Sequence, residues 1–177
     1  KQIVNLQDSH PLAVVSILGS DPFTDGRQSD RALAIRTGVE KYYHQRNWVS
    51  LAELTLKSGR RADLVVVSPK AEIIIIEVKS SIADLKADSK WSEYRDFCDF
   101  LFFATLADVP ADIFPVDAGL FIADAYDAEL LREAPTHPLS AARRKSMLLK
   151  FARNASQDYR GYLHLPTQLR QTTDRID

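Results

Sequence analysis

The clearest pattern of apolar and polar positions lies in two short apolar runs, at residues 64–67 and 73–76. Ser68, Pro69 and Lys70 separate them, and breakers between apolar runs predict two strands joined by a turn. The second run is four consecutive isoleucines, which indicates a strand that is covered on both faces and lies inside a sheet. Burial of such a side chain contributes roughly 1.5–3 kcal/mol, so we expect the core to form around these strands.

A helix and a further strand are predicted before this pair. Ser29 or Asp30 caps the helix, which runs to about Gln45. Residues 48–56 alternate apolar and polar positions, as a half-buried strand does. The turn at residues 57–60 is short enough for an antiparallel meander of three strands.

After the isoleucine strand, Ser81 and Asp84 resemble a capping box that opens a helix through about Lys90. Lys86 and Lys90 would share a face of that helix, because they are four positions apart. The same patterns predict the remaining elements, which are strands at residues 100–104 and 119–123, a helical turn at residues 127–132, and a basic helix from Ser140 to about Gln157.

Length and composition are those of one globular domain, with 177 residues of which 45% are hydrophobic and 27% charged. We expect a partly ordered segment at residues 1–25, a single domain at 26–160 and a polar tail at 161–177. The apolar stretches are shorter than the roughly twenty residues of a membrane span, and the N-terminus lacks a secretion pattern. These features predict a cytoplasmic protein with no membrane partner. Cys98 is the single cysteine, which excludes an intrachain disulfide and a thiolate metal cluster.

Three charged residues, Asp63, Glu77 and Lys79, lie at the ends of the two central strands. Glu77 and Lys79 point to the same face because they are two positions apart on a strand, and antiparallel pairing would bring Asp63 beside them. Ionised groups next to such apolar strands are costly unless they are paired or bind a metal. One interpretation is that these are polar strand ends with Lys79 paired to a carboxylate. The other is a metal-dependent catalytic site.

Asp63 and Glu77 match the chemistry of a magnesium site, because Mg²⁺ usually takes one or two carboxylates together with waters and phosphate oxygens. Mn²⁺ is an alternative ion. Lys79 would orient or help to deprotonate an attacking water, and burial beside a metal would lower its pKa. The net charge of −1 is not that of a strongly basic nucleic-acid binder, although DNA affinity depends on local patches.

Asp63 followed by Glu77, Val78 and Lys79 resembles the PD-(D/E)XK nuclease motif, with Ala62 where that motif often has proline. Longer segments resemble the MmcB-like family of DNA-repair endonucleases. These segments are GRQSDRALAIRTGVE, SGRRADLVVVSP, IEVKSSIADLKADSKWSEYRDFCDFLFFA, GLFIADAY, ARRK and FAR.

The resemblance extends over roughly residues 25–160. It implies a restriction-endonuclease-like α/β fold with an αβββαβ core, a mixed central sheet flanked by helices, and a basic C-terminal helix. It also implies a metal-dependent DNA endonuclease that acts in DNA repair on branched or damaged DNA. Many relatives in this fold cut as homodimers.

The resemblance further assigns roles to individual residues. Asp63 and Glu77 would hold Mg²⁺ with the carbonyl of Val78 as a third ligand, and Lys79 would be catalytic. Glu40, on the first helix, would approach the metal site and could serve a second metal. The alternative for Glu40 is a solvated helix glutamate.

Basic and polar residues around this core are candidates for contact with nucleic acid, because lysine and arginine neutralise phosphates without reading bases. The candidates are Arg27, Arg60, Arg61, Ser80, Lys86, Lys90, Arg143, Lys150 and Arg153. Ordinary solvated surface is the alternative for each. Two alternatives concern the whole protein, namely a catalytically silent nuclease-fold module that binds DNA or a repair partner, and RNA as the substrate.

Overall fold

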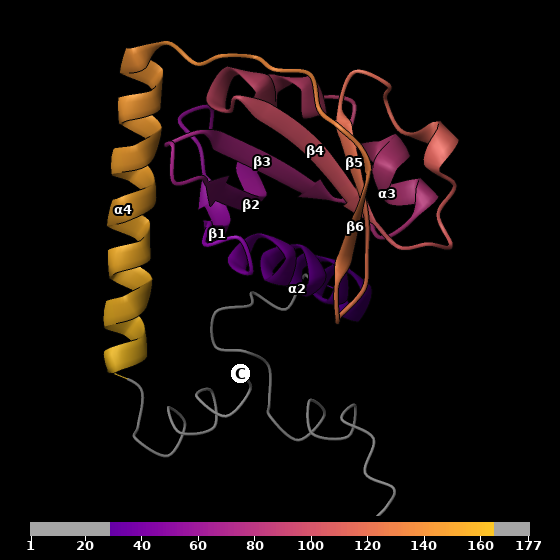
Figure 1. Ribbon diagram of the computed structural model, residues 1–177, viewed down its shortest axis with the longest axis horizontal. Coiled ribbons are helices and arrows are strands. Elements are labelled where there is room, and N and C mark those ends of the chain that lie inside the picture. The colour runs from indigo at the N-terminus through magenta and orange to yellow at the C-terminus, as the bar shows by residue number, and fades with distance from the viewer. Residues whose placement is uncertain (1–28, 165–177) are drawn as a thin grey trace, which may run out of the picture.

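The computed structural model describes residues 29–164 of the chain. Their helices and strands follow in the order α2 (Asp30–His44), β1 (Val49–Thr55), β2 (Arg61–Val67), β3 (Ile73–Val78), α3 (Ile82–Ala87), the 3₁₀ helix η1 (Trp91–Phe97), β4 (Phe100–Thr105), the 3₁₀ helix η2 (Ala111–Ile113), β5 (Gly119–Ala123), β6 (Ala128–Arg132) and α4 (Ala141–Leu163) (Figure 1). This order contains the αβββαβ core that the sequence predicted. The predicted N-terminal segment at 1–25, and residues 165–177 of the predicted tail at 161–177, lie outside the described residues.

The six strands form one mixed sheet in the order β1-β2-β3-β4-β5-β6. Strands β1, β2 and β3 are antiparallel, as the short turns predicted, whereas β3, β4 and β5 are parallel. The parallel connections are those that carry helical segments between strands, as parallel pairing requires. The α/β fold with a mixed sheet is therefore confirmed.

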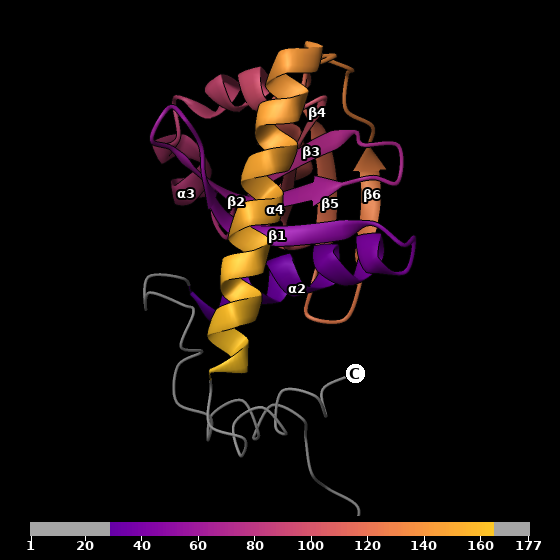
Figure 2. The same cartoon turned by 90° about the vertical axis from the view of Figure 1, so that its left-hand side faces the viewer.

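Both faces of the sheet are covered, and the isoleucine run of β3 is buried throughout. Ile74 and Ile76 pack toward α2, while Ile73 and Ile75 pack toward η1 and α4. Figures 1 and 2 show α2 beneath the sheet and α4 upright along its β1 side, with α3 on the opposite side from α4. The prediction of a strand covered on both faces is confirmed.

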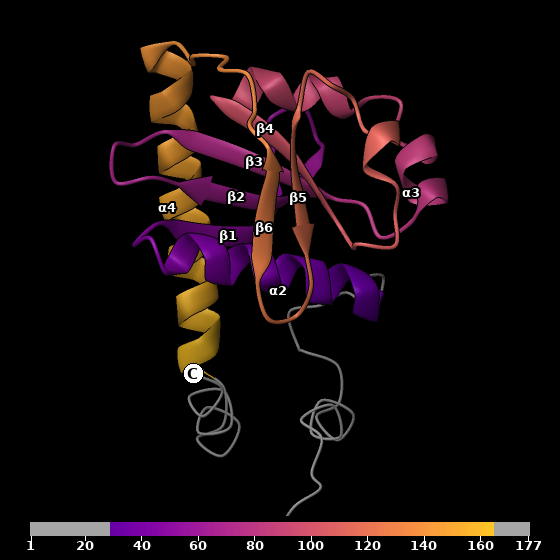
Figure 3. The same cartoon turned by 45° about the vertical axis from the view of Figure 1, so that its right-hand side comes forward.

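Helix α2 begins where the sequence predicted, because the Ser29 side chain accepts a hydrogen bond from the Ala32 N–H. Gly38 allows this helix to approach the β5–β6 turn closely. A Cβ atom at that position would lie 2.1 Å from the carbonyl oxygen of Asp124. Figure 3 shows the resulting arrangement, in which the β5–β6 turn reaches α2.

The predicted helical turn at residues 127–132 is wrong, since this segment forms β6. Glu129 and Leu131 are exposed and alternate with more buried neighbours, which is the period of a strand. The carboxylate of Asp124 accepts hydrogen bonds from the N–H groups of Tyr126 and Asp127. This contact closes the turn that pairs β6 with β5.

Two helix ends also differ from the prediction. Helix α3 ends at Ala87 rather than Lys90, because Asp88 leaves the helical conformation with φ −94° and ψ 80°. Lys86 and Lys90 therefore share no helical face. Helix α4 begins as predicted, with the Ser140 side chain accepting from the Arg143 N–H, but it continues to Leu163.

The aromatic residues Trp91, Tyr94 and Phe97 lie on η1, where a repeat of three residues per turn places them on one face. Tyr94 is buried in the core beneath η1, and Trp91 and Phe97 are half-buried against it. Cys98 is a free, fully buried cysteine, and burial raises its pKa to about 12. No helix within residues 29–164 is long and apolar enough to cross a membrane.

Candidate active site at the end of the β2–β3 ladder

The backbone pairing of β2 with β3 stops at Leu64 and Ile76, one residue before Asp63 and Glu77. Beyond this point, each carboxylate accepts a hydrogen bond from the other strand. Asp63 Oδ2 lies 2.8 Å from the N–H of Val78, and Glu77 Oε1 lies 3.5 Å from the N–H of Asp63. The structure therefore brings the two predicted acids together at the place where the ladder opens.

The opening coincides with a distortion of β1. Glu53 has a φ of 58°, a left-handed conformation that is uncommon for a residue with a side chain. On the two sides of Glu53 the strand buries opposite faces, with Ala52 toward α2 and Leu54 toward η1 and α4. By register, Glu53 lies opposite Asp63, between the pairs Ala52–Leu64 and Leu54–Ala62.

Lys79 lies on the same side as Glu77, as predicted, with 3.8 Å between its Nζ and Glu77 Oε2. Its closest acidic partner is Asp88, whose Oδ2 lies 2.7 Å from Nζ. The Lys79 backbone is fixed to β4, since its N–H donates to the Ala104 carbonyl and its carbonyl accepts from the Thr105 hydroxyl. Sequence reasoning missed Asp88 because it follows a short helix and lies outside any periodic pattern.

Burial dominates the electrostatics of this cluster. Glu77 is 2% exposed and Lys79 is 6% exposed. Burial, reinforced by the neighbouring Asp63 carboxylate, raises the pKa of Glu77 well above its ordinary value. Burial also raises the pKa of Asp63 to about 6, although the Val78 N–H and Lys79 act in the opposite direction.

The pKa of Lys79 is raised, which is opposite to the predicted direction. Burial lowers it, but the hydrogen bond that Lys79 donates to Asp88 and the charge of Glu77 together outweigh that effect. The protein's own groups thus keep Lys79 protonated.

A second group of charges lies beside the first, on α2 and β1. The Arg36 guanidinium, whose side chain is 10% exposed, lies 3.7 Å from Glu40 and 4.0 Å from Glu53. Glu53 also pairs with Arg61 and is one of the charges that raise the pKa of Asp63. The pKa of Glu40 is raised, because the effect of burial exceeds the opposing effect of the Arg36 charge. Glu40 is therefore linked to Asp63 through Arg36 and Glu53 rather than by direct contact.

No three carboxylate, histidine or cysteine side chains within residues 29–164 converge as a metal site. Glu40 does not complete a three-carboxylate site with Asp63 and Glu77. The roles of Glu40 and of the Val78 carbonyl stay predictions.

Most of the predicted nucleic-acid contacts lie on segments adjoining this cluster. Arg60 pairs with Glu93 on η1 and lies 3.9 Å from Asp88. Ser80 follows Lys79 directly, and its N–H donates to Asp84. Lys86 and Lys90 are exposed on and just after α3, and Arg61 pairs with Glu53.

The other basic candidates lie elsewhere. Arg143, Lys150 and Arg153 lie on α4, where Arg143 pairs with Asp96 at 2.9 Å. Arg27 lies outside the described residues.

The family model for DNA repair protein MmcB-like matches residues 19–163. A solved structure, the SPO1766 protein of unknown function from Silicibacter pomeroyi, is similar with a TM-score of 0.75 and 39% sequence identity. The match covers 77% of this chain and 94% of that one. Among curated proteins there is no match.

Proposed function

Because the chain belongs to the MmcB-like family of DNA repair proteins, its role lies in DNA repair, and we propose that it is a metal-dependent DNA endonuclease of the PD-(D/E)XK type. In this proposal it hydrolyses phosphodiester bonds of branched or damaged DNA. Asp63 and Glu77 hold the metal, and Lys79 assists the attacking water.

One observation carries this proposal. The half-buried carboxylate of Asp63 and the buried carboxylate of Glu77 meet where the β2–β3 ladder opens. Burial raises the pKa values of both, and the Asp63 charge raises that of Glu77 further. Lys79 does not neutralise them fully, because Asp88 holds its ammonium group. A site that lacks positive charge in this way favours binding of a cation.

The donor atoms fit Mg²⁺ or Mn²⁺, which are hard cations that prefer oxygen ligands. Two protein carboxylates are the usual complement for Mg²⁺, with the other positions left to waters and substrate phosphates. In a strand, the N–H and carbonyl of one residue point to the same side. The Val78 N–H donates to Asp63, so the Val78 carbonyl faces the same opening and is a candidate third ligand.

The bound metal would supply an activated water and stabilise charge on the phosphate. The chain's own residues would orient the water, offset phosphate charge and contact the DNA. Lys79, fixed by its backbone contacts to β4, orients the water and offsets phosphate charge. Asp88 holds the Lys79 ammonium group until substrate arrives. Arg60, which lies 3.9 Å from Asp88, and Lys90, two residues after it, would contact the DNA backbone.

Cleavage of labelled single-stranded, duplex, flap and fork DNA in Mg²⁺, Mn²⁺ or EDTA tests the proposal. We expect cutting that depends on the metal. Glu77→Ala and Lys79→Ala should each slow it by about 10²–10⁴, the range for a general acid–base or charge-stabilising group. Lys70→Ala, on the exposed β2–β3 turn, is the control and should cut at the wild-type rate.

Failure to cut any substrate, with DNA binding unchanged in both variants, would replace this proposal with a silent module that binds DNA or a repair partner. An RNA copy of each substrate tests the sugar. Faster cutting of RNA than of DNA would reassign the substrate.

A further inference from the structure

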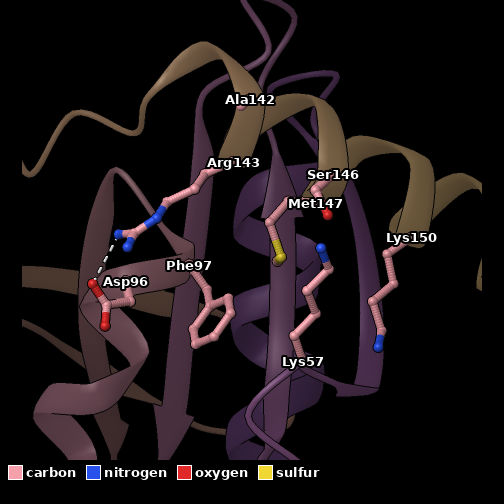
Figure 4. A pocket seen from close by; sticks show the side chains of 8 residues that line it. All are labelled: Lys57, Asp96, Phe97, Ala142, Arg143, Ser146, Met147 and Lys150. Carbon is pink, nitrogen blue, oxygen red and sulfur yellow. Dashed lines mark hydrogen bonds and ion pairs between the residues drawn. The ribbon is translucent and has the colours of Figure 1, made fainter.

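A hollow of about 340 Å³ lies between the beginning of α4, the end of η1 and the β1–β2 turn (Figure 4). Phe97 and Met147 form its apolar lining, and Lys57 and Lys150 border it from the turn and from the helix. Its volume is within the range of about 300–1,000 Å³ that small-molecule sites occupy.

The charges around this hollow are unbalanced. Arg143 is paired with Asp96 at 2.9 Å, the contact drawn as a dashed line in Figure 4. Lys57 and Lys150 have no carboxylate at ion-pair distance within residues 29–164. Within the described part of the chain, two ammonium groups without an ion-pair partner therefore border an apolar surface.

This combination matches one nucleotide of a single strand. Ammonium groups bind the backbone phosphates, and an unstacked base lies against an aromatic ring such as that of Phe97. A duplex keeps its bases stacked and would leave the apolar lining unused. An inorganic anion would leave it unused as well.

The hollow is joined to the candidate active site by a short basic segment. Lys57 opens the β1–β2 turn, in which Gly59 takes a φ of 85°, and the chain returns through Arg60 into β2. Arg60 lies 3.9 Å from Asp88, the residue that holds Lys79. The six residue steps from Lys57 to Asp63 span at most about 22 Å, a distance that one strand of DNA readily crosses.

We propose that this hollow binds a nucleotide of single-stranded DNA, and that the bound strand runs over the β1–β2 turn to Asp63 and Glu77. The direction of the strand rests on the proposed nuclease function, whereas binding in the hollow does not. The substrate would accordingly be DNA with a single-stranded arm next to the cleaved bond.

Binding measured by fluorescence anisotropy in EDTA tests the site apart from any cleavage. The ligands are a labelled 15-nucleotide single strand, the matching duplex and an RNA strand of the same sequence, each titrated at several salt concentrations. The variant Lys57→Ala/Lys150→Ala is compared with Lys70→Ala/Lys145→Ala, which removes the same charge from exposed positions outside the hollow.

We expect the first double variant to bind single-stranded DNA about tenfold more weakly, with a salt dependence reduced by about 1.4, or 0.7 for each lost phosphate contact. The control should change by less than about twofold. Phe97→Leu should weaken binding of the single strand without changing the salt dependence, because stacking releases no counterions. Circular dichroism checks that each variant is folded.

Equal losses in the two double variants, or equal losses for single strand and duplex, would overturn the inference. Tighter binding of RNA than of DNA would overturn the assignment to DNA. If the wild type cuts nothing but the hollow variants lose single-strand binding, the nuclease proposal fails and the hollow stands. If the wild type cuts and the hollow variants bind normally, only the hollow fails.

Discussion

Buried carboxylates lie at both ends of β3, and their surroundings differ. At the beginning of the strand, Asp99 accepts hydrogen bonds from the N–H groups of Ile73 and Leu139, at 2.8 and 3.0 Å. It also forms a bidentate ion pair with Arg144, with 2.7 Å from Nη2 to Oδ1. At the far end, Asp63 and Glu77 share a single lysine whose closest acidic partner is Asp88.

The pKa values follow this difference in partners. Burial acts to raise the pKa of Asp99, but Arg144 and two backbone N–H groups hold it below its ordinary value. Burial raises the pKa values of Asp63 and Glu77, because their donors are too few to offset it. Burial alone therefore does not set the direction in which the pKa of a carboxylate shifts. The number of donors that each carboxylate finds does.

The largest effect should come from removing Asp99, the carboxylate at the beginning of β3 that is paired with Arg144. Asp99→Ala removes four hydrogen bonds and leaves Arg144 beside an apolar core, so we expect a loss of about 3–5 kcal/mol in unfolding free energy. Urea denaturation measures it. The control is Asp96→Ala, which breaks the exposed ion pair with Arg143 on the same helix and should cost about 0.2–1 kcal/mol. Similar losses in the two variants would contradict a structural role for Asp99.

The pH dependence of stability should have opposite signs at the two ends. The folded-state pKa of Asp63 is about 6, above its ordinary value of 3.8, so the folded state holds the extra proton and stability falls as pH rises from about 4 to 6. Asp63→Asn should remove this loss, of order 2–3 kcal/mol. The lowered pKa of Asp99 gives stability that is present above its ordinary pKa and lost as pH falls through the folded value.

Urea unfolding of the wild type, Asp63→Asn and Asp99→Asn between pH 3 and 8 measures how the unfolding free energy depends on pH through each carboxylate. Asp158→Asn, at an exposed position on α4, is the control for loss of a carboxylate. If Asp63→Asn still loses stability fully between pH 4 and 6, the raised pKa of Asp63 is not the cause of that loss.

A smaller effect is expected from neutralising the buried glutamate. Glu77→Gln keeps the shape of the side chain but removes a charge that burial disfavours, so we expect a gain of about 1–2 kcal/mol at pH 7.5. The same variant should lose cleavage activity. Glu129→Gln on β6 is exposed and should leave stability unchanged. A loss of stability in Glu77→Gln would make this carboxylate structural, like Asp99.

Sequence patterns could predict the cluster of Asp63, Glu77 and Lys79 at the end of β3, because these residues are close in the chain. The run of isoleucines fixes β3 as a buried strand, and a spacing of two places Glu77 and Lys79 on one side of it. A short hairpin fixes the register that brings in Asp63. Strand period and turn length were sufficient for this much.

The ion pair of Asp99 with Arg144 at the beginning of β3 was not predictable in the same way. Asp99 and Arg144 are 45 positions apart, and no local pattern signals that α4 returns to the beginning of β3. Asp88 was missed for a related reason, because only the end of α3 at Ala87 turns it back toward Lys79. β6 was mistaken for a helical turn because its strand period covers only five residues and depends on pairing with β5.

The smallest expected change in stability comes from metal binding, which should involve Asp63 and Glu77 but not Asp99. Mg²⁺ at five times its dissociation constant should stabilise the folded state by about 1 kcal/mol, since a ligand of the native state adds RT ln(1 + [L]/Kd). A thermal melt with and without Mg²⁺ measures the shift, with the same ionic strength kept by NaCl. Glu77→Gln should abolish it and Asp99→Asn should keep it, because Arg144 pairs directly with Asp99, whereas the lysine beside Asp63 and Glu77 is held by Asp88. A shift that survives in Glu77→Gln would place the metal elsewhere and remove the main support for Asp63 and Glu77 as its ligands.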